Sequence, residues 1–452
     1  MSNFDRRRFL RAAAAGGFIY AFGHVPNTVM AQMAGSYAPF NDYRALVCVF
    51  LFGGNDSWNM VVPRSDAEYA VYAASRQSLA LDQTTLLPIS PLTPDGAQYG
   101  FHPAMSGVQQ LFETNRCAVI ANAGPLIAPT TKAQYAAKSV PLPPQLFSHN
   151  DQQDQWHTLK GNAQSKTGWA GRMADVLSAT TSGQQLPLNV SLSGQTIFQA
   201  GEQSVPYTMG PEGPVEFFGF AGDALADARR QGFENVVNAS YDTVYERAYA
   251  SVQHRALQVS DSVNAALAMA PTLSTTFPAT NLGTQLRTVA RTIAVRDRLQ
   301  MNRQVFFVAA GGFDTHNDQV ADQPGLLGGI SDAMAAFHAA TVELGISQSV
   351  TAFTQSDFGR TLTSNGDGTD HAWGGVQLVV GDAVRGRQFY GSYPLLEIGG
   401  AVDVGGGRLI PELSSDQYAA TLARWFGVAD TDLETIAPSL GNFATRDLGF
   451  LI

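Results

Sequence analysis

Cysteine is scarce in this chain, since only Cys48 and Cys117 occur among its 452 residues. Neither has the short spacing to another cysteine or a histidine that predicts a local metal site. At most one disulfide is possible, and an oxidising compartment would permit it. Each cysteine lies in or beside an apolar run, where a free thiol commonly behaves as a small buried hydrophobe. The sequence therefore favours two buried thiols and leaves a single bridge as the alternative.

Positive charge is also in short supply. Lys and Arg total 28 against 38 Asp and Glu, so the formal net charge is −10. This balance argues against a nucleic-acid or anionic-membrane partner. No segment is long and apolar enough for a stable membrane span. With 45% hydrophobic and 15% charged residues, the composition is that of a globular protein with ample core.

The N-terminus departs from this globular pattern. The segment "DRRRFLRAAAAGGFIYAF" pairs Arg6 with Arg7 ahead of a short, weakly apolar stretch rich in Ala and Gly. It resembles a twin-arginine export signal, and small residues at Val29 and Ala31 predict cleavage after Ala31. The alternative is an ordinary basic tail. Cleavage would remove four arginines and one aspartate, a net +3 from −10, and leave −13. We expect 1–31 to be a signal peptide, the twin-arginine export machinery to be a partner, and the mature protein to be periplasmic or otherwise exported.

Short apolar runs without alternation predict strands that are covered on both faces. Helical patterns lie between or beside these runs, at 102–113, 326–344 and 414–427. Strands that alternate with helices predict an α/β fold, with a mostly parallel central sheet and helices on both faces. The predicted strands are 45–52, 117–121, 305–310 and 350–354, with 376–380 as a possible fifth.

The middle of the chain has a different pattern. Residues 185–220 hold short strand-like pieces broken by Gly and Pro, and residues 222–303 are Ala-rich with helical spacing. We expect one α/β domain over 32–452, with a helical insertion or cap at about 160–300 between the second and third core strands.

Polar clusters follow the predicted strands, at the edge where function collects in open α/β sheets. They are "GGNDSWN", "GGFDTHNDQ", "TQSDFGRT" and, further on, "GDGTDHAWGG". Oxygen and imidazole donors from several strand ends would suit a divalent metal such as zinc or manganese. Taken singly, each residue has a structural explanation as a turn former, a cap or a solvated side chain. The candidates are Asp56, Asp314, His316, Asp357, Arg360 and His371.

A fifth cluster is "LFSHNDQQDQWHT", in which Ser148 stands where a helix is expected to begin. The free N–H groups and dipole of a helix N-terminus favour a developing negative charge, so Ser148 is a candidate nucleophile. The alternative is an ordinary N-cap serine, and the residues alone favour that alternative.

In this order, the motifs resemble an exported bacterial family catalogued as domain of unknown function 1501, which is placed with the alkaline-phosphatase and sulfatase-like fold. The resemblance spans nearly the whole mature chain. The motifs that carry it are "FLFGGNDSWNMVVP", "HPAM…LF", "FSHNDQQDQW", "GGFDTHNDQ", "SDFGRT" and "GTDHAWGG".

The resemblance implies a metal-dependent hydrolase of phosphate or sulfate esters. It implies that Ser148 attacks the ester, and that a divalent zinc, manganese, calcium or magnesium ion is bound. The metal ligands implied by the superfamily pattern are Asp56, Asp314, His316, Asp357 and His371.

Three features depart from the superfamily pattern. Phe358 stands where a His or Asn usually follows the later Asp, and the spacing from Asp314 to His316 is shorter than usual. No cysteine lies near Ser148, so nothing supports sulfatase chemistry through a modified cysteine.

We therefore expect a periplasmic hydrolase-like protein that acts on a small-molecule or glycan ester. A bound metal would polarise the ester, and Arg360 would hold the anion. The alternative is a non-catalytic exported binding or assembly protein on a degenerate phosphatase or sulfatase fold.

Overall fold

The computed structural model describes residues 37–161, 165–214 and 225–452. The predicted signal peptide at 1–31 lies outside these residues, so it stays a prediction. Within the described residues, no helix has the length and apolar character that crossing a membrane requires.

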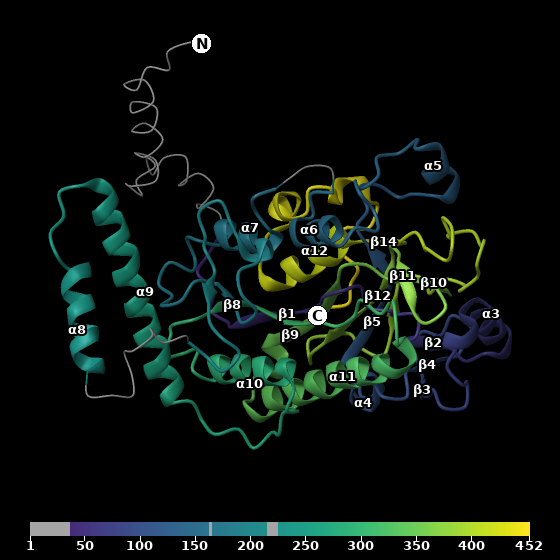
Figure 1. Cartoon of the computed structure of the whole chain (residues 1–452), viewed down its shortest axis with the longest axis horizontal. Coiled ribbons are helices and arrows are strands. Elements are labelled where there is room, and N and C mark those ends of the chain that lie inside the picture. Colours follow the sequence, from purple (N-terminus) through teal and green to yellow (C-terminus); the bar gives the residue numbers. More distant parts are fainter. Residues whose placement is uncertain (1–36, 162–164, 215–224) are drawn as a thin grey trace, which may run out of the picture.

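A nine-stranded mixed sheet forms the centre of the molecule (Figure 1), with the order β13-β5-β12-β9-β1-β8-β6-β7 and β14 beside β5. β1 pairs in parallel with β8 and β9, whereas β12 runs antiparallel to β5 and β9. The predicted mostly parallel sheet is confirmed, including the possible fifth strand. The strands are β1 (Arg44–Leu51), β5 (Cys117–Gly124), β6 (Asn189–Ser191), β7 (Tyr207–Thr208), β8 (Arg303–Ala310), β9 (Val350–Ser356), β12 (Gly375–Val380), β13 (Phe389–Tyr390) and β14 (Leu413–Ser414).

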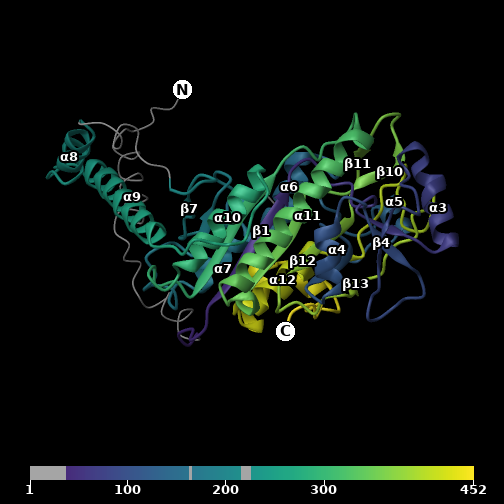
Figure 2. The same ribbon diagram turned by 90° about the horizontal axis from the view of Figure 1, so that it is seen from below.

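Helices cover both faces of this sheet (Figures 1 and 2), and β1 shows why. Its residues alternate between two apolar cores: Val47 and Val49 face one, while Leu46 and Phe50 face the other. One core is closed by α4 (Ser106–Glu113), α10 (Asn281–Ala294) and α11 (Gln319–Glu343). The other is closed by α6 (His149–Thr158), α7 (Trp169–Val176), α12 (Ser415–Phe426) and α13 (Leu433–Ile436). The three helices expected from the sequence are among them.

Smaller elements surround this body. A three-stranded sheet has the order β2-β4-β3, and a two-stranded sheet pairs β10 with β11. The elements are β2 (Val61–Pro63), β3 (Leu87–Ile89), β4 (Tyr99–Phe101), β10 (Arg360–Ser364), β11 (Thr369–His371), α3 (Asp66–Arg76) and α5 (Lys132–Ala137).

The segment predicted as an insertion, about 160–300, contributes partly to the central sheet and its covering helices and partly to a projecting pair of helices. Its strands β6 and β7 extend the main sheet beyond β8, and its helices α7 and α10 cover that sheet. The helices α8 (Ala226–Val237) and α9 (Val244–Ala268) project from the body in both views (Figures 1 and 2). The domain boundary itself stays a prediction.

The two cysteines are both buried free thiols, as the sequence favoured. Cys48 lies in β1 and Cys117 begins β5, and β12 and β9 separate these two strands in the sheet. Burial raises the pKa of each thiol.

Candidate functional site

The polar loops meet at one edge of the sheet because of the strand directions. β1, β8 and β9 are parallel, so the loops that follow them emerge at the same edge. β12 is antiparallel to β9 and therefore begins at this edge. As a result β11, which precedes β12, lies beside the loop of residues 311–318, and Thr369 N donates to Thr315 O at 3.0 Å.

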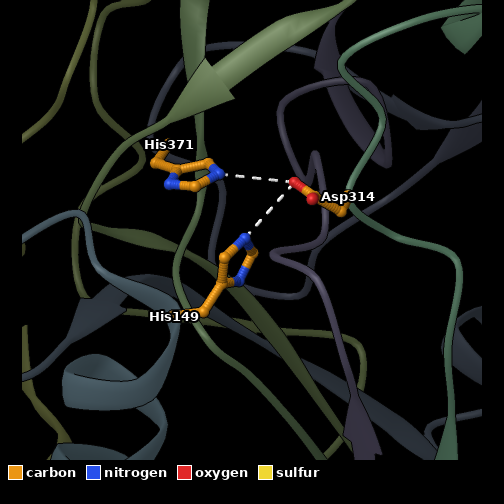
Figure 3. A group of neighbouring side chains, drawn as sticks. All are labelled: His149, Asp314 and His371. Carbon is orange, nitrogen blue, oxygen red and sulfur yellow. Dashed lines mark ion pairs between the residues drawn. The ribbon is translucent and has the colours of Figure 1, made fainter.

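Three side chains from different elements form a group that can bind a metal (Figure 3). Asp314 comes from the loop after β8, His149 is the first residue of α6, and His371 ends β11. Asp314 Oδ1 lies 3.4 Å from His149 Nε2 and 3.4 Å from His371 Nε2. The three ligand atoms all lie within 4.8 Å of one another.

A third imidazole, His316, lies at the border of this group. Its Nε2 is 3.1 Å from Asp314 Oδ1 and 2.9 Å from His371 Nε2. Arg360 Nη1 lies 3.5 Å from the same His316 nitrogen.

The outer nitrogen of each imidazole faces a hydrogen-bond acceptor. His149 Nδ1 is 2.6 Å from Asp357 Oδ2, and His316 Nδ1 is 3.2 Å from Asp370 Oδ1. His371 Nδ1 is 2.8 Å from the Phe147 carbonyl oxygen, which can only accept. A proton at Nδ1 leaves Nε2 as the lone-pair nitrogen in a neutral His149 or His371 ring, whereas the 2.9 Å contact between His316 Nε2 and His371 Nε2 needs a proton on one of these two atoms. This arrangement is typical of metal-ligating histidines.

The chemistry of these donors, and two of the three separations between them, fit a transition metal. Metal–nitrogen bonds of about 2.0–2.1 Å in a tetrahedral site place ligand atoms roughly 3.3 Å apart. The contacts of 3.4 Å from Asp314 Oδ1 to the two Nε2 atoms match this separation. Imidazole-rich sets favour zinc and similar ions, whereas calcium and magnesium prefer oxygen donors.

The charges in the group favour the forms that bind metal. Burial alone would raise the pKa of Asp314, but the hydrogen bond and charge of Arg360, with the neighbouring histidines, hold that pKa below its usual value. Burial lowers the pKa of His371, and the nearby charges of His149 and Arg360 lower it further. The hydrogen bond to the Phe147 carbonyl and the charge of Asp314 raise this pKa, but they do not outweigh the lowering effects. An ionised Asp314 beside a neutral His371 is the state that a metal site requires.

Asp357 lies behind His149 and is fully buried. Its Oδ2 accepts from Gly53 N at 3.1 Å and Gln153 Nε2 at 2.9 Å, in addition to His149. Its Oδ1 is buried without a hydrogen-bond partner among the described residues. Through these contacts Asp357 orients the imidazole of His149. The predicted role of Asp357 as a direct metal ligand stays a prediction.

The structure places Asp56 outside the group. Its carboxylate is buried, pairs with Arg76 of α3 and accepts from Gln319 Nε2. Gln319 in turn accepts from the Thr369 hydroxyl at 2.7 Å. Asp56 therefore connects α3, α11 and β11, and its charge is balanced by Arg76.

Arg360 is also buried, and its N–H groups bind the loops around the site. Nε donates to Gly54 O at 2.9 Å, and Nη1 donates to Thr369 O at 3.0 Å. Nη2 donates to Gly53 O at 2.6 Å and to Asp314 Oδ1. Through these hydrogen bonds Arg360 links the loops to one another. Its predicted role in binding the anion of the substrate stays a prediction.

Ser148 occupies the N-cap position of α6, as the sequence predicts, but its side chain makes no capping hydrogen bond. The hydroxyl instead donates to Asp151 Oδ2 at 2.6 Å. The preceding Phe147 has a φ of 72°, a conformation uncommon for a bulky residue. Such strain is frequent at functional sites, and the strained Phe147 carries the carbonyl that accepts from His371.

His149 stands outside the site residues expected from the motifs, although it directly follows Ser148 in "LFSHNDQ". The signal that could have identified it is the pairing of a histidine at a helix start with acidic residues at strand ends. Gln153 and the Phe147 carbonyl had no comparable signal, because their roles depend on tertiary contacts.

The fold and these side chains define an α/β protein with a candidate metal-binding group at the carboxyl edge of its sheet. The chain belongs to the family described as "Protein of unknown function (DUF1501)", whose model matches residues 43–405. The resemblance stated from the sequence motifs is thereby confirmed for the family.

Two solved structures are similar to this chain at low identity. The PsFucS1 sulfatase from Pseudoalteromonas sp. has 9% identity and a TM-score of 0.36, covering 94% of this chain and 74% of its own. Ps i-CgsB in complex with k-i-k-neocarrahexaose has 8% identity and a TM-score of 0.32, covering 87% and 74%. Among curated proteins, none matches this sequence. The α/β architecture therefore rests on the sheet itself.

Proposed function

We propose that this chain is an exported, metal-dependent hydrolase-like protein on an alkaline-phosphatase-like fold, acting on a phosphate or sulfate ester. One observation carries the proposal: the Nε2 atoms of His149 and His371 converge on Asp314 Oδ1, while the Nδ1 of each ring is held by an acceptor. Such a set of donors is built for a cation.

His149, Asp314 and His371 would hold the ion, with His316 beside them, and zinc fits this donor set best. When bound, the ion would polarise an ester oxygen and lower the pKa of a nearby hydroxyl or water. Asp357 keeps a proton at His149 Nδ1, so that Nε2 stays available to the ion.

Ser148 is the proposed nucleophile, at the N-terminus of α6 and directly before His149. Asp151 accepts the hydroxyl hydrogen bond at 2.6 Å and would accept the proton as Ser148 Oγ bonds to phosphorus or sulfur. The ester bond to the alcohol breaks in the same step, and the departing alkoxide takes a proton from water. A second water then hydrolyses the serine ester, which releases phosphate or sulfate and restores the hydroxyl. The helix start stabilises the developing negative charge.

A non-catalytic binding or assembly role is the second candidate, and specific contacts favour it. The ring of Phe358 packs against His149 and His371, with centroids 4.8 Å and 4.7 Å apart, at the position where the superfamily pattern has a polar residue. In addition, the charge of Asp56 is already balanced by Arg76. A second metal ion at these positions has no support in this geometry.

The experiment is an ester screen on protein purified through its native export route. We expect zinc-dependent release of nitrophenol from 4-nitrophenyl phosphate or 4-nitrophenyl sulfate, lost after chelation and restored by zinc. Full activity in metal-free protein would refute the metal-dependent mechanism. Inactivity of the zinc-loaded protein on both esters would favour the non-catalytic candidate.

A further inference from the structure

A cavity of about 520 Å³ lies at the carboxyl ends of β1 and β8, between the start of α10 and the middle of α11. Phe52 and Phe313 line its inner side, and Leu282, Leu326 and Ile330 line the helical side. This volume falls within the range of pockets that hold drug-sized ligands.

The described residues that line the cavity include no charged side chain. The buried amide of Gln285 is already used by the backbone of β8, since it accepts from Ala309 N at 3.0 Å and donates to Ala309 O at 2.9 Å. Burying a charge without a partner is costly. The wall also includes the uncharged polar side chains of Ser193, Thr280 and Asn281, so the cavity suits a neutral, mainly apolar group.

Glycines keep this cavity open. A Cβ added at Gly311, Gly325 or Gly329 would meet no atom within 4 Å, and none of the three has a positive φ. Gly325 and Gly329 are four residues apart inside α11 and so share one face of the helix. Glycine is unfavourable inside a helix relative to alanine. Here neither the backbone nor a close neighbour requires it, and its effect is to leave space in the cavity.

Two residues of the cavity wall are chain neighbours of residues in the loops that hold the candidate metal group. Phe313 directly precedes Asp314, and Phe52 directly precedes Gly53. Phe313 N donates to Phe52 O at 3.2 Å, which joins the two loops. Gly53 approaches Asp314 so closely that a Cβ on Gly53 would lie 2.3 Å from Asp314 N.

We propose that this cavity binds the alcohol part of the ester and selects a neutral, mainly apolar alcohol carrying a ring. This inference rests on the proposed function, because it assigns the cavity to the substrate of the metal group. A small aliphatic ester would leave the cavity empty, whereas an aromatic ester would contact Phe52 and Phe313.

The test fills the cavity without disturbing the fold. Gly329→Leu places a side chain in the open space, and Gly232→Leu is the matched control, because Gly232 is a helical glycine of α8 that also has no atom within 4 Å of an added Cβ. We expect Gly329→Leu to lower kcat/KM for 2-naphthyl phosphate or sulfate roughly tenfold or more relative to the methyl ester. Gly232→Leu should leave this ratio unchanged.

Binding of 2-naphthol, measured by calorimetry, separates the two proposals. If no ester is hydrolysed, yet 2-naphthol binds the native protein and not Gly329→Leu, the proposed function fails and the assignment of the cavity to an ester alcohol fails with it, although the cavity binds a neutral ring compound. If esters are hydrolysed but Gly329→Leu leaves the ratio of the two substrates unchanged, the cavity assignment is overturned and the proposed function stands. Absence of 2-naphthol binding to the native protein also overturns it.

Discussion

Asp357 orients His149 from behind: its Oδ2 lies 2.6 Å from His149 Nδ1, while Nε2 of the same ring lies 3.4 Å from Asp314 Oδ1. Asp357→Asn would replace the carboxylate with an amide, which orients the imidazole less strongly. We expect zinc affinity to fall about 10–100-fold without being abolished, as for other outer partners of metal-bound histidines. Calorimetric zinc titration measures this change.

Asp370→Asn provides the parallel variant, since Asp370 faces His316 Nδ1 at 3.2 Å. It should have a smaller effect than Asp357→Asn, because Asp370 is half-exposed and Asp357 is fully buried. Complete loss of zinc binding in Asp357→Asn alone would contradict the orienting role and favour Asp357 as a direct ligand.

Ser148→Ala should abolish ester hydrolysis while zinc content and melting temperature stay nearly unchanged, because its side chain makes no capping bond to α6. Asp151→Asn should lower kcat more than it changes KM, since Asp151 is the proposed proton acceptor. Steady-state kinetics and thermal melts of both variants provide the measurement.

A different result would assign Ser148 a structural role. A lower melting temperature with unchanged activity would make Ser148 a structural residue at the helix start, with a loss of roughly 1 kcal/mol typical of an N-cap. The nucleophile would then be a water molecule, and the donor set around Asp314 would keep its explanation.

The architecture was more predictable from the sequence than the site. The apolar runs of the central strands are continuous because β1, β9 and β12 are buried on both faces, so composition alone marked them. The direction of β12 had no local signal, since a strand's direction depends on its neighbours. Yet that direction brings His371 to the edge where Asp314 lies.

The site residues, too, could be predicted only where local motifs determine their position. Asp314, His316 and His371 were expected to meet, and the structure brings them together. Asp56 was expected to join them, but its charge is balanced by Arg76, which lies 20 positions later in the chain. A buried ion pair between residues this far apart in the chain cannot be predicted from a local motif.

A pH prediction follows from His157, which is buried against the rings of Phe50 and Phe307. Burial lowers its pKa from 6.5 to about 3. Below pH 6.5 the unfolded chain therefore binds a proton that the folded chain does not. The stability contribution of the neutral ring is complete above pH 6.5 and is lost as the pH falls toward 3.

Replacing His157 with Phe removes this titration and keeps a ring in the aromatic cluster. We expect the free energy of unfolding of His157→Phe to depend less steeply on pH between 7 and 5 than that of the native protein. The difference in slope should approach about 1.4 kcal/mol per pH unit at the acidic end. Urea unfolding at several pH values measures it, and equal slopes for the two proteins would contradict the burial effect.

Export is tested at Arg6 and Arg7, which precede the weakly apolar stretch. Replacing both with Lys should trap the protein in the cytoplasm, because the twin-arginine pathway depends on this pair. Fractionation of cells that produce each form measures its location. Normal delivery of the double variant would rule out the twin-arginine assignment.

The most direct test of the central claim is the zinc content of the folded protein, measured by elemental analysis. We expect about one zinc ion per chain in the native protein, loss of that ion in His149→Ala and His371→Ala, and retention in His338→Ala. His338 is a suitable control because its imidazole pairs with Asp382 at 2.9 Å and is not a member of the group around Asp314. Zinc bound equally by all four proteins, or by none of them, would contradict the account.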